Sequence, residues 1–264
     1  MSIALFGAAC SDDETSTNTG ATNTTAVAAD PAAFCSAYAT VAPAITGEPG
    51  DPAELESAIE ELESNAPTAI AAQVETLATS LKEASAPTDT TATEDTAAEG
   101  TATDGTAADG GGEEGGPPSE EMLTSSAAVG FYAAENCGDE TLEVTARDYE
   151  FVGLPTTLTA GSYGIVLDNQ GTEWHEMILV KKNDGVTQTA QELLQLPEEE
   201  VFQYITNVGG AFAAPGEKTG MVAELTEGDY VAVCFIPVGT TTLDSTSEGP
   251  PHAMEGMVSE FSVS

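Results

Sequence analysis

One stretch of this 264-residue chain, residues 86–118, limits what the rest can fold into. It consists only of Thr, Ala, Asp, Glu, Gly and Pro, in near-repeats such as Thr-Ala-Thr-Glu-Asp and Thr-Ala-Thr-Asp-Gly. This composition offers too little apolar surface to offset the conformational entropy lost on folding, so we expect the stretch to be disordered. The ordered parts must lie on either side of it, and 41% apolar residues overall are enough for two modest cores.

Residues 30–138, with the disordered stretch as an insertion, carry apolar side chains at helical spacing. Asp30-Pro31 and Asp51-Pro52 each place a capping carboxylate before a proline, which favours the start of a helix. Ser119 caps the last helix, which ends at Asn136-Cys137-Gly138. Because each expected helix has a single apolar face, the helices must pack together as a small bundle. The positions that define the four helices are Phe34, Tyr38, Val41 and Ile45; Leu55, Ile59 and Leu62; Ile70, Val74, Leu77 and Leu81; and Met122, Val129, Phe131 and Tyr132.

The four cysteines can be assigned from this arrangement. In an up-and-down bundle the start of the first helix and the end of the fourth lie at the same end, so Cys35 and Cys137 are placed to form a disulfide. Cys10 is then left for lipid attachment and Cys234 is left free. The alternative is that Cys234 pairs with Cys35 or Cys137.

The N-terminus predicts export. Residues 1–10 form a short apolar run that ends in small residues before Cys10, and this resembles the lipobox of bacterial lipoproteins. Gly7 stands where leucine is usual and no basic residue precedes the run; an ordinary signal peptide or a frayed terminus is the alternative. Residues 11–29 read as a flexible stalk. We expect a protein of the cell envelope, tethered by lipid to the outer face of the cytoplasmic membrane.

The charge of the chain restricts its partners. There are 45 acidic residues and five basic ones, which give a formal net charge of -40 at pH 7. Nucleic acid and anionic lipid head groups are therefore poor partners, and membrane contact is expected through the lipid anchor only. A cationic redox protein or a metal ion is a better partner, although an acidic coat is also common on soluble surfaces.

In residues 139–264 the apolar residues no longer recur at helical spacing but alternate with polar ones. Roughly seven short strands, each with one buried face, predict a mainly β fold, a β-sandwich that follows the helical bundle. Within Thr189 to Asn207 the apolar spacing predicts one or two helical turns between strands. The side chains expected on buried strand faces are Leu142, Val144 and Ala146; Tyr163, Ile165 and Leu167; Met177 and Leu179; and Val231, Val233 and Phe235.

Four side chains in this second part suit a soft metal ion. Cys234, His252 and Met257 lie close together in the sequence, and His175 precedes them on an expected strand. A thiolate, two imidazoles and a thioether favour copper over magnesium or calcium. Zinc also accepts histidine and cysteine, but a methionine ligand argues against it. Each residue also has a structural alternative. Cys234 could be a thiol of the core, and His175 could cap a turn. His252 could be an exposed loop residue, and Met257 could simply pack in the core.

The same residues carry a family resemblance. The runs Asn169-Gln170-Gly171-Thr172-Glu173-Trp174-His175-Glu176, Gly228-Asp229-Tyr230-Val231-Ala232-Val233-Cys234-Phe235-Ile236-Pro237 and Pro251-His252-Ala253-Met254-Glu255-Gly256-Met257 resemble the copper-binding segments of cupredoxins such as plastocyanin. The resemblance implies a cupredoxin-like Greek-key β-sandwich. It also implies a type 1 (blue) copper site with His175, Cys234 and His252 as equatorial ligands. It implies Met257 as the weak axial ligand.

One feature departs from that family. Cupredoxins usually leave two to four residues between the cysteine and the second histidine, whereas residues 235–251 intervene here. Because the entropy of loop closure grows slowly with length, the added residues need not separate the ligands. Met254 competes with Met257 for the axial position. Trp174, Phe235 and Ile236 are the apolar neighbours expected to keep water from the sulfur.

Two functional classes follow. The first is a copper-binding envelope lipoprotein that transfers electrons or holds copper, and the second is a metal-free sandwich that serves as a protein-binding or structural module. An enzyme is not expected, because the chain has no Ser-His-Asp order, no phosphate-binding loop and no dinucleotide-binding glycine motif.

Overall fold

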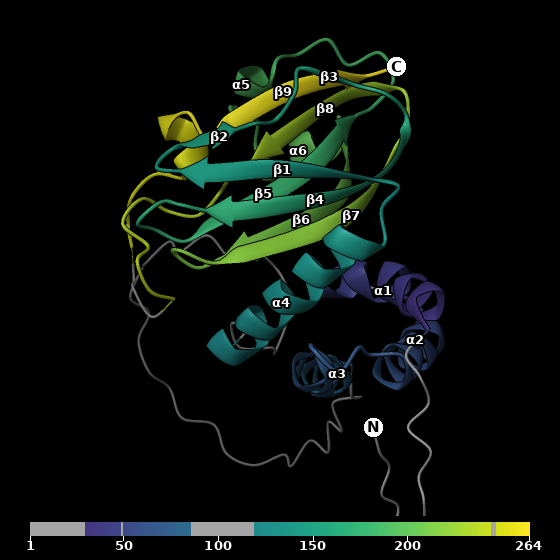
Figure 1. The fold of residues 1–264 in the computed structure, drawn as a ribbon. Helices are drawn as coiled ribbons and strands as arrows, with labels where there is room; N and C mark the ends of the chain where they lie inside the picture. Colours follow the sequence, from purple (N-terminus) through teal and green to yellow (C-terminus); the bar gives the residue numbers. More distant parts are fainter. Residues whose placement is uncertain (1–29, 49, 86–118, 244–246) are drawn as a thin grey trace, which may run out of the picture.

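The computed structural model describes residues 30–48, 50–85, 119–243 and 247–264. The expected lipid-attachment residue Cys10, the stalk and the low-complexity stretch 86–118 lie outside these ranges. A group of helices is followed by two β-sheets stacked as a sandwich, which confirms the expected fold class (Figure 1). Among the described residues, no helix is both long and apolar enough to cross a lipid bilayer.

The helices begin where the caps predict. The side chains of Asp30 and Asp51 each accept two hydrogen bonds from backbone N–H groups of the following turn, and Ser119 accepts one from Met122. These bonds satisfy N–H groups that have no partner within the helix. The buried faces of the helices form one apolar cluster that contains Phe34 and Val74. The helices are α1 (Pro31–Ile45), α2 (Pro52–Ser64), α3 (Ala71–Ala84) and α4 (Glu120–Asn136).

A disulfide joins Cys35 near the start of α1 to Cys137 at the end of α4. The Cα atoms of the two residues are 5.3 Å apart and 102 positions apart in the sequence. Cys234 is free and fully buried, so the alternative pairings do not occur in the structure. The bundle is therefore closed covalently at one end.

The sandwich consists of two sheets. Strand β4 pairs in parallel with β1 and antiparallel with β7, while β8 lies antiparallel between β5 and β9. The first sheet has the order β2 (Glu150–Val152), β1 (Glu140–Arg147), β4 (Gly161–Asn169), β7 (Lys218–Leu225). The second has the order β3 (Thr157–Leu158), β9 (Val258–Val263), β8 (Gly228–Val233), β5 (His175–Lys182), β6 (Ile205–Ala213). Short helices α5 (Ala190–Leu193), α6 (Glu198–Val201) and η1 (His252–Glu255) lie between strands.

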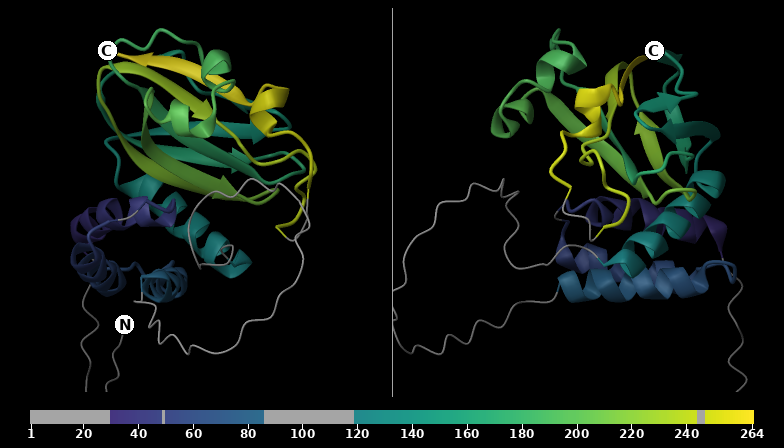
Figure 2. Two further views of the ribbon diagram at one scale, coloured as in Figure 1. Left: turned by 180° about the vertical axis from the view of Figure 1, so that it is seen from behind. Right: turned by 90° about the vertical axis from the view of Figure 1, so that its left-hand side faces the viewer.

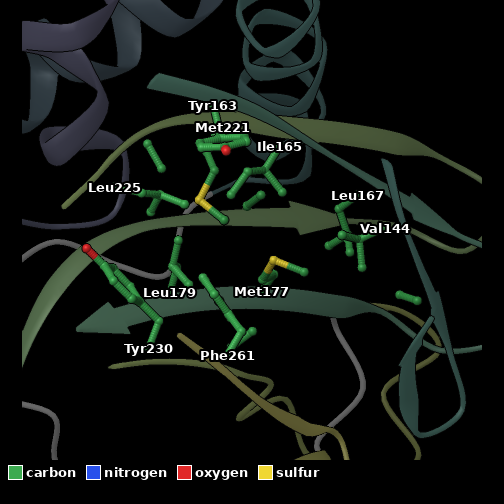
Figure 3. Packing of buried hydrophobic residues seen from close by; sticks show 14 of the residues in the cluster. Val144, Tyr163, Ile165, Leu167, Met177, Leu179, Met221, Leu225, Tyr230 and Phe261 are labelled. Atoms are coloured by element: carbon green, nitrogen blue, oxygen red, sulfur yellow. The ribbon is translucent and has the colours of Figure 1, made fainter. Parts of the chain in front are cut away.

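The space between the sheets is filled by apolar side chains from both inner faces (Figure 3). Burying an aliphatic or aromatic side chain of this size stabilises the fold by about 1.5–3 kcal/mol. The labelled members of the cluster are Val144, Tyr163, Ile165, Leu167, Met177, Leu179, Met221, Leu225, Tyr230 and Phe261. Most of the expected core positions on β1, β4 and β5 are confirmed by this cluster.

Two sequence expectations were wrong in the second sheet. Val231 and Val233 are buried as expected, on the outer face of β8 beneath α5, but Phe235 is 47% exposed. The inner face of β8 carries Tyr230 and Ala232, and Cys234 continues it. Because β8 is buried on both faces, its apolar residues do not alternate and the inner face cannot be read from the sequence. Similarly, Ile205 begins strand β6 instead of ending a helical turn.

Helix α4 rests directly on the first sheet, across β4 and β7 (Figures 1 and 2). A Cβ atom built on Gly164 would lie 1.7 Å from the carbonyl oxygen of Ala134, and one built on Gly130 would lie 2.3 Å from the carbonyl oxygen of Gly220. Only glycine permits this approach between helix and strand backbones. The helical region and the sandwich are thus held in direct contact.

Candidate metal centre

The first ligand candidate, His175, is the first residue of β5 and follows a turn built by Asn169. The Asn169 amide nitrogen donates hydrogen bonds to the carbonyl oxygens of Glu173 and Ala213, both at 2.9 Å, and its oxygen accepts from the N–H of Gly171. Asn169 is fully buried with all these bonds formed. It therefore fixes the path of the chain that leads into His175.

Cys234 lies just beyond the end of β8 and points into the space between the sheets. Its N–H donates to the carbonyl oxygen of Met257 (3.2 Å), and its carbonyl oxygen accepts from the N–H of Ala253 (2.8 Å). The Sγ atom accepts a long hydrogen bond from the N–H of Glu176 (3.5 Å). Backbone bonds thus tie the cysteine to the segment that carries the second histidine and the methionine.

His252 begins η1, after the long segment that follows Cys234. The N–H of His252 donates to the carbonyl oxygen of Ile236 (2.9 Å), and the N–H of Val238 donates to that of Pro250 (2.9 Å). These bonds close the base of the loop, so its two ends stay together although the loop is long. The loop and η1, both yellow, extend from the left-hand end of the sandwich in Figure 1.

The three candidate donor atoms converge. Nδ1 of His175 lies 3.1 Å from Nδ1 of His252, which lies 3.3 Å from Sγ of Cys234, and the three atoms all lie within 4.8 Å of one another. All three side chains are fully buried. Across the described ranges, no other group of His, Cys, Asp and Glu side chains is close enough to share an ion.

Each imidazole is held at its other nitrogen by a carboxylate. Nε2 of His175 lies 2.8 Å from Oδ1 of Asp148, and Nε2 of His252 lies 3.0 Å from Oε2 of Glu173. A carboxylate only accepts, so both Nε2 atoms carry a proton, and in a neutral ring the Nδ1 atom then has a free lone pair. Two lone pairs that face each other at 3.1 Å repel unless a proton or a cation lies between them.

The charges around the histidines support the placement of the ring protons on the Nε2 atoms. Burial raises the pKa of the Asp148 carboxyl, but hydrogen bonds from Thr172 and His175 outweigh burial and lower it. Burial likewise raises the pKa of Glu173, and bonds from Gly239, Tyr149 and His252 outweigh it. Both carboxylates are therefore charged. Burial lowers the pKa of His175, which keeps its Nδ1 free of a second proton.

The donor set fits a copper ion. Metal–nitrogen bonds of about 2.0–2.1 Å at angles near 100–110° place two nitrogens roughly 3.1–3.4 Å apart, which matches the His175–His252 spacing. Burial raises the pKa of the Cys234 thiol to about 12, so without a metal the thiol is neutral, whereas a coordinated thiol loses its proton. A soft sulfur between two imidazoles suits copper.

The two methionines are distinguished by burial. The Met257 side chain is fully buried in the inner core, and its N–H donates to the carbonyl oxygen of His252 (3.0 Å). Met254 is 51% exposed. The structure therefore places Met257, and not Met254, on the inner side with Cys234. Of the expected apolar neighbours, Trp174 is buried and Ile236 packs against the core, whereas Phe235 is exposed.

Sequence reasoning did not find Asp148 and Glu173. Asp148 lies in the turn between β1 and β2, where an acidic residue is ordinary, and nothing in the sequence pairs it with His175. Glu173 precedes His175 by two residues but contacts the other histidine. Buried Glu176 was also missed; it accepts a hydrogen bond from the N–H of Phe235, and burial raises its pKa to about 7. Only spatial proximity reveals these three.

No family model and no curated protein matches the sequence. Solved structures match over about half of the chain. Auracyanin B is 19% identical over 48% of this chain and 90% of its own, with a TM-score of 0.30. Auracyanin from the photosynthetic bacterium Roseiflexus castenholzii is 16% identical over 47% of this chain and 96% of its own, with a TM-score of 0.32. Reduced rusticyanin is 20% identical over 47% of this chain and 77% of its own, with a TM-score of 0.30. The C-terminal sheets resemble a cupredoxin β-sandwich, which the described helices α1 to α4 precede.

Proposed function

We propose that the β-sandwich binds one copper ion through His175, Cys234 and His252, with Met257 as a weak fourth ligand. The observation that carries this proposal is the convergence of three buried donor atoms: the two histidine Nδ1 atoms lie 3.1 Å apart, and Nδ1 of His252 lies 3.3 Å from the Cys234 sulfur. A metal-free module would need a proton shared between the two Nδ1 atoms to relieve the repulsion of their lone pairs. A bound cation removes the repulsion and uses all three donors.

The role that fits such a site is one-electron transfer or the holding of copper. Copper would supply a one-electron redox couple, and the protein supplies the rest. The two Nδ1 atoms and Sγ bind, while the carboxylates of Asp148 and Glu173 orient the rings. Full burial of the ligands excludes water, so little rearrangement accompanies a change of charge.

The cellular setting is part of the same proposal. The Cys35–Cys137 disulfide suits an oxidising compartment outside the cytoplasm. Together with the lipobox-like run before Cys10, it supports export and a lipid anchor on the outer face of the cytoplasmic membrane. The net charge of -40 favours a cationic redox partner, whose association should weaken as salt is raised.

The test is copper loading of the purified protein. One equivalent of Cu(II) should be retained after desalting and should give an intense visible absorption from thiolate-to-copper charge transfer. Cys234→Ser should lose this absorption, whereas Met254→Leu, at an exposed methionine, should keep it. A folded wild-type protein that stays colourless and retains no copper would refute the proposal.

A further inference from the structure

Each ring nitrogen of the two histidines faces another polar atom of the protein. On the inner side the Nδ1 atoms face each other and the thiol, and on the outer side each Nε2 meets a carboxylate. The Asp148 side chain is 26% exposed and the Glu173 side chain is 12% exposed, whereas both histidines are fully buried. The two carboxylates therefore form the layer between the imidazoles and solvent.

Asp148 is itself fixed from the side of the first ligand loop. The backbone N–H of Thr172 is shared by both carboxylate oxygens (3.2 Å to Oδ1 and 3.1 Å to Oδ2), and the Thr172 hydroxyl donates to Oδ2 (2.8 Å). Oδ1 also accepts the hydrogen bond from Nε2 of His175 (2.8 Å). These bonds from the loop and from the ring fix the orientation of the carboxylate.

Glu173 connects three separate segments. Its Oε2 accepts hydrogen bonds from Nε2 of His252 (3.0 Å) and from the N–H of Gly239 (2.5 Å) in the long loop. Its Oε1 accepts from the hydroxyl of Tyr149 (2.9 Å), whose ring lies 4.6 Å from the His252 ring. Because Glu173 precedes His175 by only two residues, the segment of the first histidine holds the second one.

We propose that Asp148 and Glu173 are positioning residues of the metal centre: each fixes one imidazole with Nδ1 turned inward, and together they favour Cu(II) over Cu(I). This inference rests on the proposed copper binding. An imidazole whose Nε2–H donates to a carboxylate is a stronger electron donor, because the negative charge polarises the N–H bond. Two such rings stabilise the more highly charged Cu(II) state more than the Cu(I) state. Glu173 also secures the long loop against the site.

The experiment uses charge-removing variants of the full-length protein. In Asp148→Asn and Glu173→Gln the amide oxygen can still accept the ring N–H, and the amide NH2 faces a hydroxyl, of Thr172 or Tyr149, that can accept in turn. The ring contact is therefore kept while the charge is lost. Each variant should bind Cu(II) about 10–100-fold more weakly, with Cu(I) affinity nearly unchanged. The reduction potential should then rise by about 60–120 mV, at about 59 mV for each tenfold change. Asp148→Ala and Glu173→Ala, which lose the acceptor, should also lower the occupancy of copper.

Glu255→Gln is the matched control. Glu255 is exposed and lies in η1 with His252, so the variant removes the same charge from the same end of the sandwich, but no hydrogen bond joins Glu255 to either ring. Its reduction potential should stay near the wild-type value. If Asp148→Asn and Glu173→Gln shift the potential no more than Glu255→Gln does, the inference is wrong.

The copper-free protein gives an independent readout. Nitrogen-15 NMR should show both imidazoles protonated at Nε2, with ring protons that exchange slowly, and the Ala variants should lose this pattern. Rings that carry a proton on Nδ1 and none on Nε2 would overturn the inference whether or not copper binds. A wild-type protein that binds no copper but shows the Nε2–H pattern would refute the proposed function, while the carboxylates would keep their positioning role.

Discussion

The Nδ1 atoms of His175 and His252 lie 3.1 Å apart, although 77 positions separate the two residues in the sequence. A ligand that binds only the folded state stabilises it by about 2.7 kcal/mol at a hundredfold excess over its dissociation constant. Copper should therefore raise the melting temperature of the wild-type protein. His252→Ala, which removes one of the facing lone pairs, should lose most of this increase in differential scanning calorimetry. An equal increase in the variant would mean that copper binds elsewhere.

The two methionines should respond differently to the same substitution. Met257→Leu preserves the buried volume but removes the thioether, so the higher charge state loses a weak donor and the reduction potential should rise by roughly 60 mV for a tenfold effect. Met254→Leu, on an exposed side chain, should leave the potential and the spectrum unchanged. Cyclic voltammetry of both variants checks this. A shift in Met254→Leu alone would assign the axial role to the exposed residue.

The Cys35–Cys137 disulfide should stabilise the helical region by restricting the unfolded chain. With 102 positions between the cysteines, the chain-entropy relation gives about 4–5 kcal/mol. We expect Cys35→Ser/Cys137→Ser to lower the free energy of unfolding in urea by this amount. Reduced wild-type protein serves as the comparison and should match the double variant. The copper spectrum of the folded variant should be unchanged, since neither cysteine belongs to the site.

The glycine contact between α4 and the first sheet should tolerate no side chain. In Gly164→Ala the added methyl would meet the backbone of Ala134, which cannot move aside without shifting α4, so we expect a loss of about 3 kcal/mol or more. Gly50→Ala is the control, because a Cβ there has no atom within 4 Å. It should change stability by less than about 0.5 kcal/mol. Equal effects of both substitutions in chemical denaturation would contradict the contact.

Buried Glu176 should make the copper-free protein less stable as pH rises. Its pKa is raised from 4.5 to about 7 in the folded state, so its stabilising contribution is complete below about pH 4.5 and is lost as pH rises through 7. Glu176→Gln cannot ionise and keeps an oxygen for the N–H of Phe235. Its free energy of unfolding should therefore exceed that of the wild type by about 3 kcal/mol at pH 8 but not at pH 4. Parallel pH profiles of the two proteins would show that this carboxylate is not responsible.

Local patterns were enough to predict much of this structure. Helix caps at Asp30, Asp51 and Ser119 are short-range features, and so are the alternating residues of β1, β4 and β5. The metal-ligand candidates could be chosen because only two histidines and one unpaired cysteine are available. Their convergence could be expected only through the family resemblance, because it depends on contacts between distant segments.

The unpredicted features share a physical cause. The exposure of Phe235 was not predicted, because β8 is apolar on both faces and its pattern does not show where burial ends. Strand β6 was partly missed because its Gly209-Gly210 pair lacks a strand signal. Asp148 and Glu173 act through tertiary contacts that have no characteristic spacing. Acidic residues are also so common in this chain that no single one stands out.

The hydrogen bonds Ile236–His252, Val238–Pro250 and Trp174–Thr240 fix the base of the long loop beside the candidate metal ligands. Changes of length or sequence beyond Thr240 and before Gly249 should therefore leave the donor atoms in place. Recognition of a docking protein could evolve at this tip while the chemistry of the centre is preserved. The same boundary offers a grafting point at which a foreign peptide could be inserted beside the candidate metal centre.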